Sequence, residues 1–149
     1  MNALSGETLA RLAPCGLDCG RCLNNPQSPI ATLAVRLREE LGGFGARAAF
    51  FAALEPVFEK YQDFETVLDR LASGECSGCR TGKCLLGECR PQSCVKERGV
   101  NFCFECSSFP CQESGLEGGL KARWEKNNRM MREMGVEAYL VMTLEKPRY

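Results

Sequence analysis

The stretch from Cys76 to Cys111 contains eight of the chain's eleven cysteines within thirty-six residues. These eight are Cys76, Cys79, Cys84, Cys89, Cys94, Cys103, Cys106 and Cys111. The other sizeable apolar residues of the stretch follow neither helical nor strand periodicity, so hydrophobic burial cannot order it alone. Structural Zn²⁺ contributes about 10–16 kcal/mol in small cysteine-rich modules. The stretch therefore predicts a metal site.

Two C-x-x-C pairs support this prediction. Cys76-Ser77-Gly78-Cys79 and Cys103-Phe104-Glu105-Cys106 have the two-residue gap with which a tight turn directs both sulfurs at one cation. Gly78 favours the first turn because it accepts a positive φ. The two pairs together predict one four-cysteine site. The cysteines that remain for a second set of four are Cys84, Cys89, Cys94 and Cys111.

A disulfide framework is the main alternative. Disulfides need an oxidising compartment and usually an even number of cysteines, whereas this chain has eleven. The first thirty residues contain no apolar run long enough for a signal peptide. We therefore expect a cytoplasmic protein whose reduced thiols bind metal, with inert reduced thiols as the remaining alternative.

The absence of histidine restricts the kind of metal site. Thiolates must dominate the coordination, and all-sulfur coordination suits Zn²⁺ and iron–sulfur clusters about equally well. Zn²⁺ is the predicted cofactor, and an iron–sulfur cluster is the alternative. Lysine and arginine side chains near the cysteines are expected to balance the negative charge of the thiolates. The charged residues of the stretch are Arg80, Lys83, Arg90, Lys96 and Arg98 against Glu88, Glu97 and Glu105.

Length and composition predict one domain of 149 residues in four segments. These segments are a first cysteine cluster at 1–27, a helical core at 28–74, the cysteine-rich metal-binding segment at 75–112 and C-terminal helices at 113–149. The predicted fold is mainly α, with a small helical core and an irregular cysteine-rich segment held by metal through zinc-knuckle-like turns or short β-hairpins. No stretch approaches the ~20 apolar residues of a membrane span. The neutral net charge does not favour nucleic-acid binding.

Apolar periodicity and capping residues predict the helices. We expect a helix over 5–12 with Ser5 as its cap, and one from Pro29 that Ser28 caps and Gly42-Gly43 ends. The apolar stripe of the second helix is Ile30, Leu33, Ala34, Leu37 and Leu41. Further helices are predicted over 44–54, from the cap Asp63 to 71, over 120–134 and over 136–144. The aromatic residues interpreted as core packing rather than a ligand pocket are Phe44, Phe50, Phe51, Phe58 and Tyr61.

The first three cysteines, Cys15, Cys19 and Cys22, form a C-x₃-C-x₂-C cluster. Radical S-adenosylmethionine enzymes use this spacing to hold an iron–sulfur cluster with one open iron. Those enzymes build a barrel of strands and helices, for which this chain is short, and no alternating strand–helix pattern follows Cys22. A structural metal, with Asp18 or a later cysteine as the remaining ligand, is the simpler interpretation.

Several motifs then form a longer pattern. It begins with Ala13-Pro14-Cys15-Gly16-Leu17-Asp18-Cys19-Gly20-Arg21-Cys22 and Glu75-Cys76-Ser77-Gly78-Cys79-Arg80. It continues with Cys94-Val95-Lys96-Glu97-Arg98-Gly99-Val100, Cys103-Phe104-Glu105-Cys106, Phe109-Pro110-Cys111 and Met134-Gly135-Val136-Glu137. This pattern resembles a widespread, uncharacterised, cysteine-rich microbial family, the domain of unknown function 3795. The resemblance covers most of the chain and implies metal binding without a defined activity; Cys84 is an addition to the family's usual cysteines.

Three functions fit these features. The first is a zinc-binding structural or interaction protein, because a closed four-cysteine zinc site has no position for a substrate. The second is an iron–sulfur protein for electron transfer or for radical chemistry at Cys15, Cys19 and Cys22. The third is thiol chemistry that stores metal or senses oxidants. Because histidine, a diagnostic carboxylate pair and nucleotide-binding glycine motifs are missing, the sequence favours a protein without acid–base enzyme activity over an enzyme, with carboxylate bases assembled by the fold as the alternative. The expected partners are metal ions and a protein.

Overall fold

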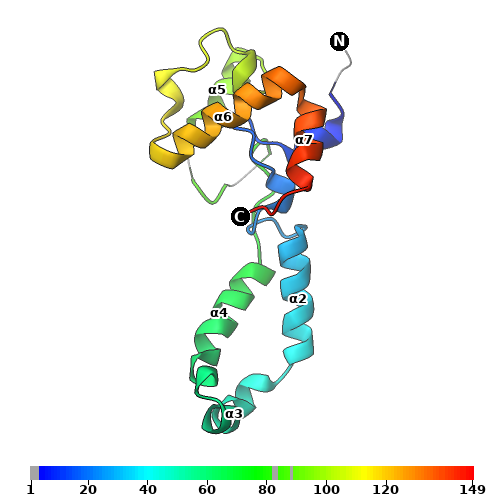
Figure 1. Cartoon of the computed structure of the whole chain (residues 1–149), viewed down its shortest axis with the longest axis vertical. Coiled ribbons are helices and arrows are strands. Elements are labelled where there is room, and N and C mark those ends of the chain that lie inside the picture. The colour runs from blue at the N-terminus through cyan, green and yellow to red at the C-terminus, as the bar shows by residue number, and fades with distance from the viewer. Residues whose placement is uncertain (1–3, 82–83, 88) are drawn as a thin grey trace. The chain divides into compact units, whose positions relative to one another are not determined.

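The computed structural model describes residues 4–81, 84–87 and 89–149 (Figure 1). Every regular element in these ranges is helical, which confirms the mainly α fold. The α-helices are α1 (Gly6–Arg11), α2 (Pro29–Leu41), α3 (Ala48–Leu54), α4 (Tyr61–Ala72), α5 (Arg90–Arg98), α6 (Gly118–Met134) and α7 (Val136–Leu144). The 3₁₀ helices are η1 (Cys19–Arg21), η2 (Phe44–Arg47), η3 (Pro56–Lys60), η4 (Cys103–Glu105) and η5 (Gln112–Ser114). None of these helices has both the length and the apolar character needed to cross a bilayer.

The chain divides into two compact units. Unit 1 combines Met1–Cys22 with Cys76–Tyr149, and unit 2 is Leu23–Glu75. All eleven cysteines belong to unit 1. The two parts of unit 1 are therefore far apart in the sequence, whereas unit 2 is one continuous segment inserted between them. The single domain expected from length stays a prediction.

Several helix ends lie where the capping residues predict them. The Ser5 hydroxyl accepts a hydrogen bond from the Thr8 N–H at 3.1 Å, and the Ser28 hydroxyl accepts one from the Ala31 N–H at 3.1 Å. Each bond satisfies a backbone donor that the first turn of a helix leaves without a partner. Gly135 ends α6 with a φ of 87°, a backbone conformation that a residue with a Cβ rarely adopts.

Other elements differ from the sequence predictions. Helix α4 begins at Tyr61, so Asp63 lies in its first turn and does not cap it. Helix α5 is not predicted, because Val95 is the only aliphatic residue in it. Two sequence features do indicate this helix: the proline in its first turn and Gly99 at its end. Gly99 adopts the left-handed conformation, with a φ of 65°. The described residues form no β-hairpin, and their one isolated β-bridge joins Leu12 to Asp18.

The core of unit 1 joins distant parts of the chain. Its buried residues are Leu12, Phe102, Met131, Val136, Tyr139 and Leu140. Helix α6 contacts both α7 and η4, and Figure 1 shows α6 and α7 side by side. Phe102 precedes η4 and is 0% exposed, so it links the cysteine-rich stretch to the helical core. The main buried cluster thus lies in unit 1 and not in the helices of 28–74, which the sequence predicts as the core.

Unit 2 is a pair of neighbouring helices joined through α3. Helices α2 and α4 lie side by side (Figure 1), and Ala31, Ala34 and Leu68 are buried there. Leu33 and Leu37 of the predicted stripe are 65% and 45% exposed. The stripe is wrong at these two positions, because the helices approach through small residues and this unit has no further layer to cover the leucines.

The aromatic residues of unit 2 pack against one another. The ring centroids of Phe44 and Tyr61 are 4.7 Å apart, and those of Phe44 and Phe51 are 5.0 Å apart. Phe58 contacts both Phe44 and Phe51, at 5.6 and 5.9 Å. Such tilted and offset contacts are typical of aromatic packing. The interpretation of these four residues as packing is confirmed, whereas Phe50 is 65% exposed.

Candidate metal centres

All eleven cysteines lie within the described residues and remain thiols. They form two groups, which we name by their size. The four-cysteine cluster consists of Cys94, Cys103, Cys106 and Cys111. The seven-cysteine cluster consists of Cys15, Cys19, Cys22, Cys76, Cys79, Cys84 and Cys89, and its members Cys15 and Cys89 also lie near Cys103 of the other group. Across the ranges that the structure describes, no group of three cysteine or carboxylate side chains has the geometry of an assembled metal site.

Two C-x-x-C pairs are built as 3₁₀ turns. Cys19 begins η1 and Cys103 begins η4. The N–H of Cys22 donates to the Cys19 carbonyl at 3.2 Å, and the N–H of Cys106 donates to the Cys103 carbonyl at 3.1 Å. Residues three apart in a 3₁₀ helix project from the same side. Each turn therefore directs its two sulfurs to one side of the backbone.

The third pair, Cys76 and Cys79, turns through a glycine. Gly78 has a φ of 101°, as the sequence predicts, and its N–H donates to the Cys76 sulfur at 3.4 Å. The Leu17 N–H makes the same kind of hydrogen bond with the sulfur of Cys15, two residues before it. A backbone N–H directed at sulfur stabilises the thiolate, which is the form of cysteine that binds metal.

The four-cysteine cluster lines a cavity of about 30 Å³. Cys94 comes from α5, Cys103 and Cys106 come from the η4 turn, and Cys111 precedes η5. A cavity of about 10–15 Å³ already holds one water-sized sphere, so this one has room for a single ion or water. Trp124 of α6 forms part of the same wall and is 2% exposed.

The indole N–H of Trp124 is a buried donor without an acceptor in the described part of the chain. It lies beside the Cys103 thiol but outside hydrogen-bond geometry. Burial raises the pKa of Cys103 to about 11, and the neighbouring indole N–H opposes this rise. Buried donors are nearly always satisfied in folded proteins. A thiolate at Cys103 would supply the acceptor that this indole lacks.

Arg98 brings positive charge to the four-cysteine cluster from the last turn of α5. Its guanidinium donates a hydrogen bond to the Cys94 sulfur, and this bond raises the pKa of Arg98. Arg98 also pairs with Glu113 at 3.8 Å. The base therefore lies where it can stabilise a thiolate, as the sequence predicts for bases in this stretch. Lys83 and Glu88, which belong to the same predicted set of charges, lie outside the described residues.

In the seven-cysteine cluster, a hydrogen bond joins the side chains of Cys19 and Cys79. This bond lowers the pKa of Cys19 and raises the pKa of Cys79. The backbone N–H of Cys79 also donates to the Cys19 sulfur. Both hydrogen bonds favour the thiolate form of Cys19 and hold its sulfur against the second C-x-x-C pair.

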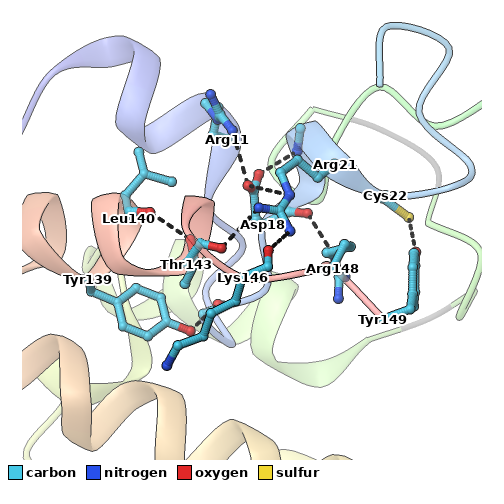
Figure 2. Close-up of polar contacts among 12 residues, drawn as sticks. Arg11, Asp18, Arg21, Cys22, Tyr139, Leu140, Thr143, Lys146, Arg148 and Tyr149 are labelled. Carbon is cyan, nitrogen blue, oxygen red and sulfur yellow. Dashed lines mark hydrogen bonds and ion pairs between the residues drawn. The ribbon is translucent and has the colours of Figure 1, made fainter. Parts of the chain in front are cut away.

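The remaining thiols of this cluster lie near one another and are partly or fully buried. Burial raises the pKa of Cys76 and Cys89, and it raises the pKa of Cys15 to about 12. Neighbouring cysteines add to each rise, because like charges repel. The Tyr149 hydroxyl lies 4.0 Å from the Cys22 sulfur (Figure 2). A bound cation is the group that would remove the repulsion between these thiolates.

The grouping of cysteines differs from the one expected from spacing. Cys76–Cys79 was expected to join Cys103–Cys106, but the structure brings it to Cys19–Cys22 instead. Cys103–Cys106 lies with Cys94 and Cys111. Spacing within the cysteine-rich stretch does not reveal that residues from the N-terminal segment fold back onto it.

Asp18, considered from the sequence as a metal ligand, has other partners. Its carboxylate is buried, accepts hydrogen bonds from the Gly20 N–H at 2.9 Å and from Arg11 at 3.1 Å, and lies 3.9 Å from Arg21. The bond to Gly20 caps η1. Asp18 therefore positions the turn that carries Cys19, and its role as a metal ligand stays a prediction.

Asn128 is an organising residue that the sequence analysis missed. It is 0% exposed on α6, and its side-chain oxygen accepts from the Phe104 N–H at 3.0 Å. Its amide nitrogen donates to the carbonyls of Pro14 at 3.3 Å and Trp124 at 3.1 Å. One side chain thus ties the η4 turn and the start of the first cysteine motif to α6. Its only sequence signal is a polar residue four positions after Trp124, on the same helix face.

Arg80 is a second residue of this kind, directly after Cys79. Its Nε donates to the Leu9 carbonyl at 2.7 Å and the Leu12 carbonyl at 3.2 Å. The guanidinium also lies 4.9 Å from the centre of the Phe102 ring. Arg80 therefore satisfies carbonyls at the end of α1 and fastens the second C-x-x-C pair to the core.

Comparison with known families agrees with the motif pattern. A family model described as "Protein of unknown function (DUF3795)" matches residues 11–115, a range that includes all eleven cysteines. No curated protein and no solved structure shows a significant match. Because the family model covers well over half of the 149 residues, the chain belongs to the DUF3795 family of proteins of unknown function.

Proposed function

We propose that this protein binds Zn²⁺ through cysteine thiolates and that the bound zinc stabilises unit 1. The supporting observation is the four-cysteine cluster around a single cavity of about 30 Å³. Four thiolates are the full ligand set of a tetrahedral structural zinc site. A closed site of this type has no open position for a substrate, so the proposed role is structural or that of an interaction module in the cytoplasm.

The chemistry around the cluster supports the proposal. The Trp124 indole and the Arg98 guanidinium are both donors beside its sulfurs, and both favour thiolate over thiol. Donors that contact metal-bound sulfur are a regular part of such sites. Zinc coordination would require the four sulfurs to move closer together than they lie in the described structure.

The sparse core of the cysteine-rich stretch gives a second reason. Among its described residues, Val95 and Phe102 are the only buried aliphatic or aromatic side chains. Burial of a single such side chain contributes about 1.5–3 kcal/mol, less than the contribution of one structural zinc. Metal coordination is therefore the interaction best able to order this stretch.

A second zinc ion is proposed for the seven-cysteine cluster. Its expected ligands are the two C-x-x-C pairs, Cys19–Cys22 and Cys76–Cys79, because these pairs are joined by the hydrogen bond between Cys19 and Cys79. The remaining thiols are Cys15, Cys84 and Cys89. They would surround the ion without completing a separate set of four.

Elemental analysis of anaerobically purified protein tests the proposal. The expected result is colourless protein with about two zinc ions per chain. Cys103→Ser and Cys106→Ser should each lower the zinc content by about one ion, because each removes one of four ligands. Cys84→Ser is the matched control and should leave the content unchanged. Equal metal content in all three variants and the wild type would refute the assignment.

An iron–sulfur protein for electron transfer is the second candidate. The observation that favours it is the number of thiols in the seven-cysteine cluster, which exceeds the four ligands of one zinc ion. The C-x₃-C-x₂-C motif of Cys15, Cys19 and Cys22 could hold three irons of a cluster and leave one open. Brown protein with iron and sulfide in place of zinc would support this candidate against the first.

A further inference from the structure

A second cavity in unit 1, of about 500 Å³, is lined by α6, α7, the loop around Asp18 and the segment after α7. Its volume is within the range of about 300–1,000 Å³ that small-molecule sites occupy. Its lining contains none of the eleven cysteines, all of which are described. The cavity borders the seven-cysteine cluster through Tyr149 and Arg123, but no cysteine sulfur lines it.

The lining of this cavity is strongly basic. Its charged residues are Arg21, Arg123, Lys126, Lys146, Arg148 and Asp18. Five of these six are cations, although the chain as a whole has a formal net charge of +0. The positive charge is thus a local concentration in a concave site, where it attracts anions most effectively.

Two of the five cations help to form the wall of the cavity. Figure 2 shows Arg21 and Arg148 beside Asp18, whose carboxylate is already paired with two arginines. Arg21 donates to the carbonyls of Thr143 at 2.9 Å and Lys146 at 2.7 Å, and the Arg148 Nε donates to the Asp18 carbonyl at 3.3 Å. These bonds hold the segment after α7 against η1 and keep the cavity open on the side of α6.

The other three cations are available to a ligand. The side chains of Arg123, Lys126 and Lys146 make no hydrogen bond or ion pair with any residue that the structure describes. Arg123 and Lys126 are one helical turn apart on α6, and Lys146 follows α7. Three such charges match a phosphate dianion better than a single carboxylate, and arginine and lysine are the side chains that bind phosphate.

Part of the remaining lining is apolar. Met130, Tyr139 and Met142 line the cavity, and the Tyr139 hydroxyl is occupied because it donates to the Gly16 carbonyl at 2.8 Å. Met130 and Met142 are partly buried and offer their thioether groups to a ligand, whereas Tyr139 is 3% exposed and offers little of its ring. Methionine adapts its shape to flat apolar groups. A bare inorganic anion would leave this part of the cavity without a contact.

We propose that this cavity binds a small organic phosphate, with the phosphate group at Arg123, Lys126 and Lys146 and a flat apolar body against Met130 and Met142. The proposal depends on the charges and the shape of one cavity only. It does not require either metal site, and the metal content of the protein tests those sites separately.

Calorimetric titration of the full chain tests this proposal with three probes: adenosine monophosphate, inorganic phosphate and adenosine. Adenosine monophosphate should bind at least about tenfold more tightly than either fragment, because it alone contacts both parts of the cavity. The double variant Lys126→Gln/Lys146→Gln should weaken its binding about tenfold or more, because it removes two charge-assisted hydrogen bonds. Both lysines are exposed, so the fold should be unchanged.

Arg129→Gln is the matched control. Arg129 is also an exposed cation of α6, but it pairs with Glu125 at 3.7 Å and does not line the cavity. Its loss should leave the affinity for adenosine monophosphate unchanged. The proposal is overturned if adenosine monophosphate does not bind, if inorganic phosphate binds equally well, or if Arg129→Gln weakens binding as much as the double variant.

Discussion

Units 1 and 2 differ in how they are built from the chain and in what they bury. Unit 1 joins two distant parts of the chain, carries every cysteine and buries large side chains such as Phe102 and Trp124. Unit 2 contains no cysteine, is one continuous segment and leaves Leu33 and Phe50 each 65% exposed. The seven-cysteine cluster joins the two distant parts of unit 1, whereas the neighbouring helices of unit 2 pack without any cysteine.

The stability of each unit should follow from this difference. Long-range contacts have a high entropic cost, and strong interactions are needed to offset it. In unit 1 the proposed zinc ions and buried polar links such as Asn128 provide them. In unit 2, α2 and α4 belong to one continuous segment, so their contacts span a shorter stretch of chain than those that join the two parts of unit 1.

Removal of metal should have the largest effect, and it should separate the two units. After a strong chelator is added under reducing conditions, amide hydrogen exchange in η1, α5 and η4 should rise about 100-fold or more, because unit 1 loses its main source of order. Exchange in α2 and α4 should stay near its original rate. Hydrogen-exchange mass spectrometry measures both regions in one sample. An equal rise in the two units would show that they unfold together.

Asn128→Ala should destabilise unit 1 by about 2–4 kcal/mol, because it removes three hydrogen bonds and leaves buried backbone groups unsatisfied. Urea unfolding followed by Trp124 fluorescence measures this change. Asn127→Ala, at the preceding position of α6, should cost less than about 0.5 kcal/mol. If both variants lose the same stability, Asn128 has no special role in joining the cysteine turns.

Trp124→Phe should weaken metal binding by about 10–100-fold, the usual effect of removing a donor that supports a metal ligand. Phenylalanine keeps an aromatic ring against Phe109 but has no N–H for the Cys103 sulfur. Competition with a coloured chelator measures the affinity. Tyr139→Phe is the control, because it also removes one buried polar hydrogen from unit 1 but lies away from the four-cysteine cluster. An unchanged affinity in Trp124→Phe would show that the indole does not support the site.

Leu33→Ser in unit 2 should have the smallest effect, below about 0.5 kcal/mol, because the side chain is largely exposed. Leu68→Ala should cost about 2 kcal/mol or more, since Leu68 is 4% exposed. Thermal unfolding followed by helical circular dichroism compares the two. A loss at Leu33 as large as that at Leu68 would mean that this face of α2 is covered in solution, and sedimentation would then reveal self-association.

Local features of the fold could be predicted from the sequence with good accuracy. Ser28 caps α2, Gly78 turns between two cysteines and Gly135 ends α6, because each depends only on the backbone of a few neighbouring residues. Helix α5 was not predicted, because its residues show no hydrophobic periodicity. The partial error in the stripe of α2 has a different cause: helix periodicity identifies an apolar face but not whether another element covers it.

The sequence by itself determined that the chain is mainly helical, rich in thiols and a member of its family, and it determined which cysteines form C-x-x-C pairs. Only the tertiary structure decided which pairs lie together, because the 23–75 segment separates Cys19–Cys22 from Cys76–Cys79. One local turn sets the relative positions of the two sulfurs within a pair. The partner of that pair depends on how the chain re-enters unit 1 after residue 75, and the packing of α6 against the cysteine-rich stretch brings Trp124 to the four-cysteine cluster.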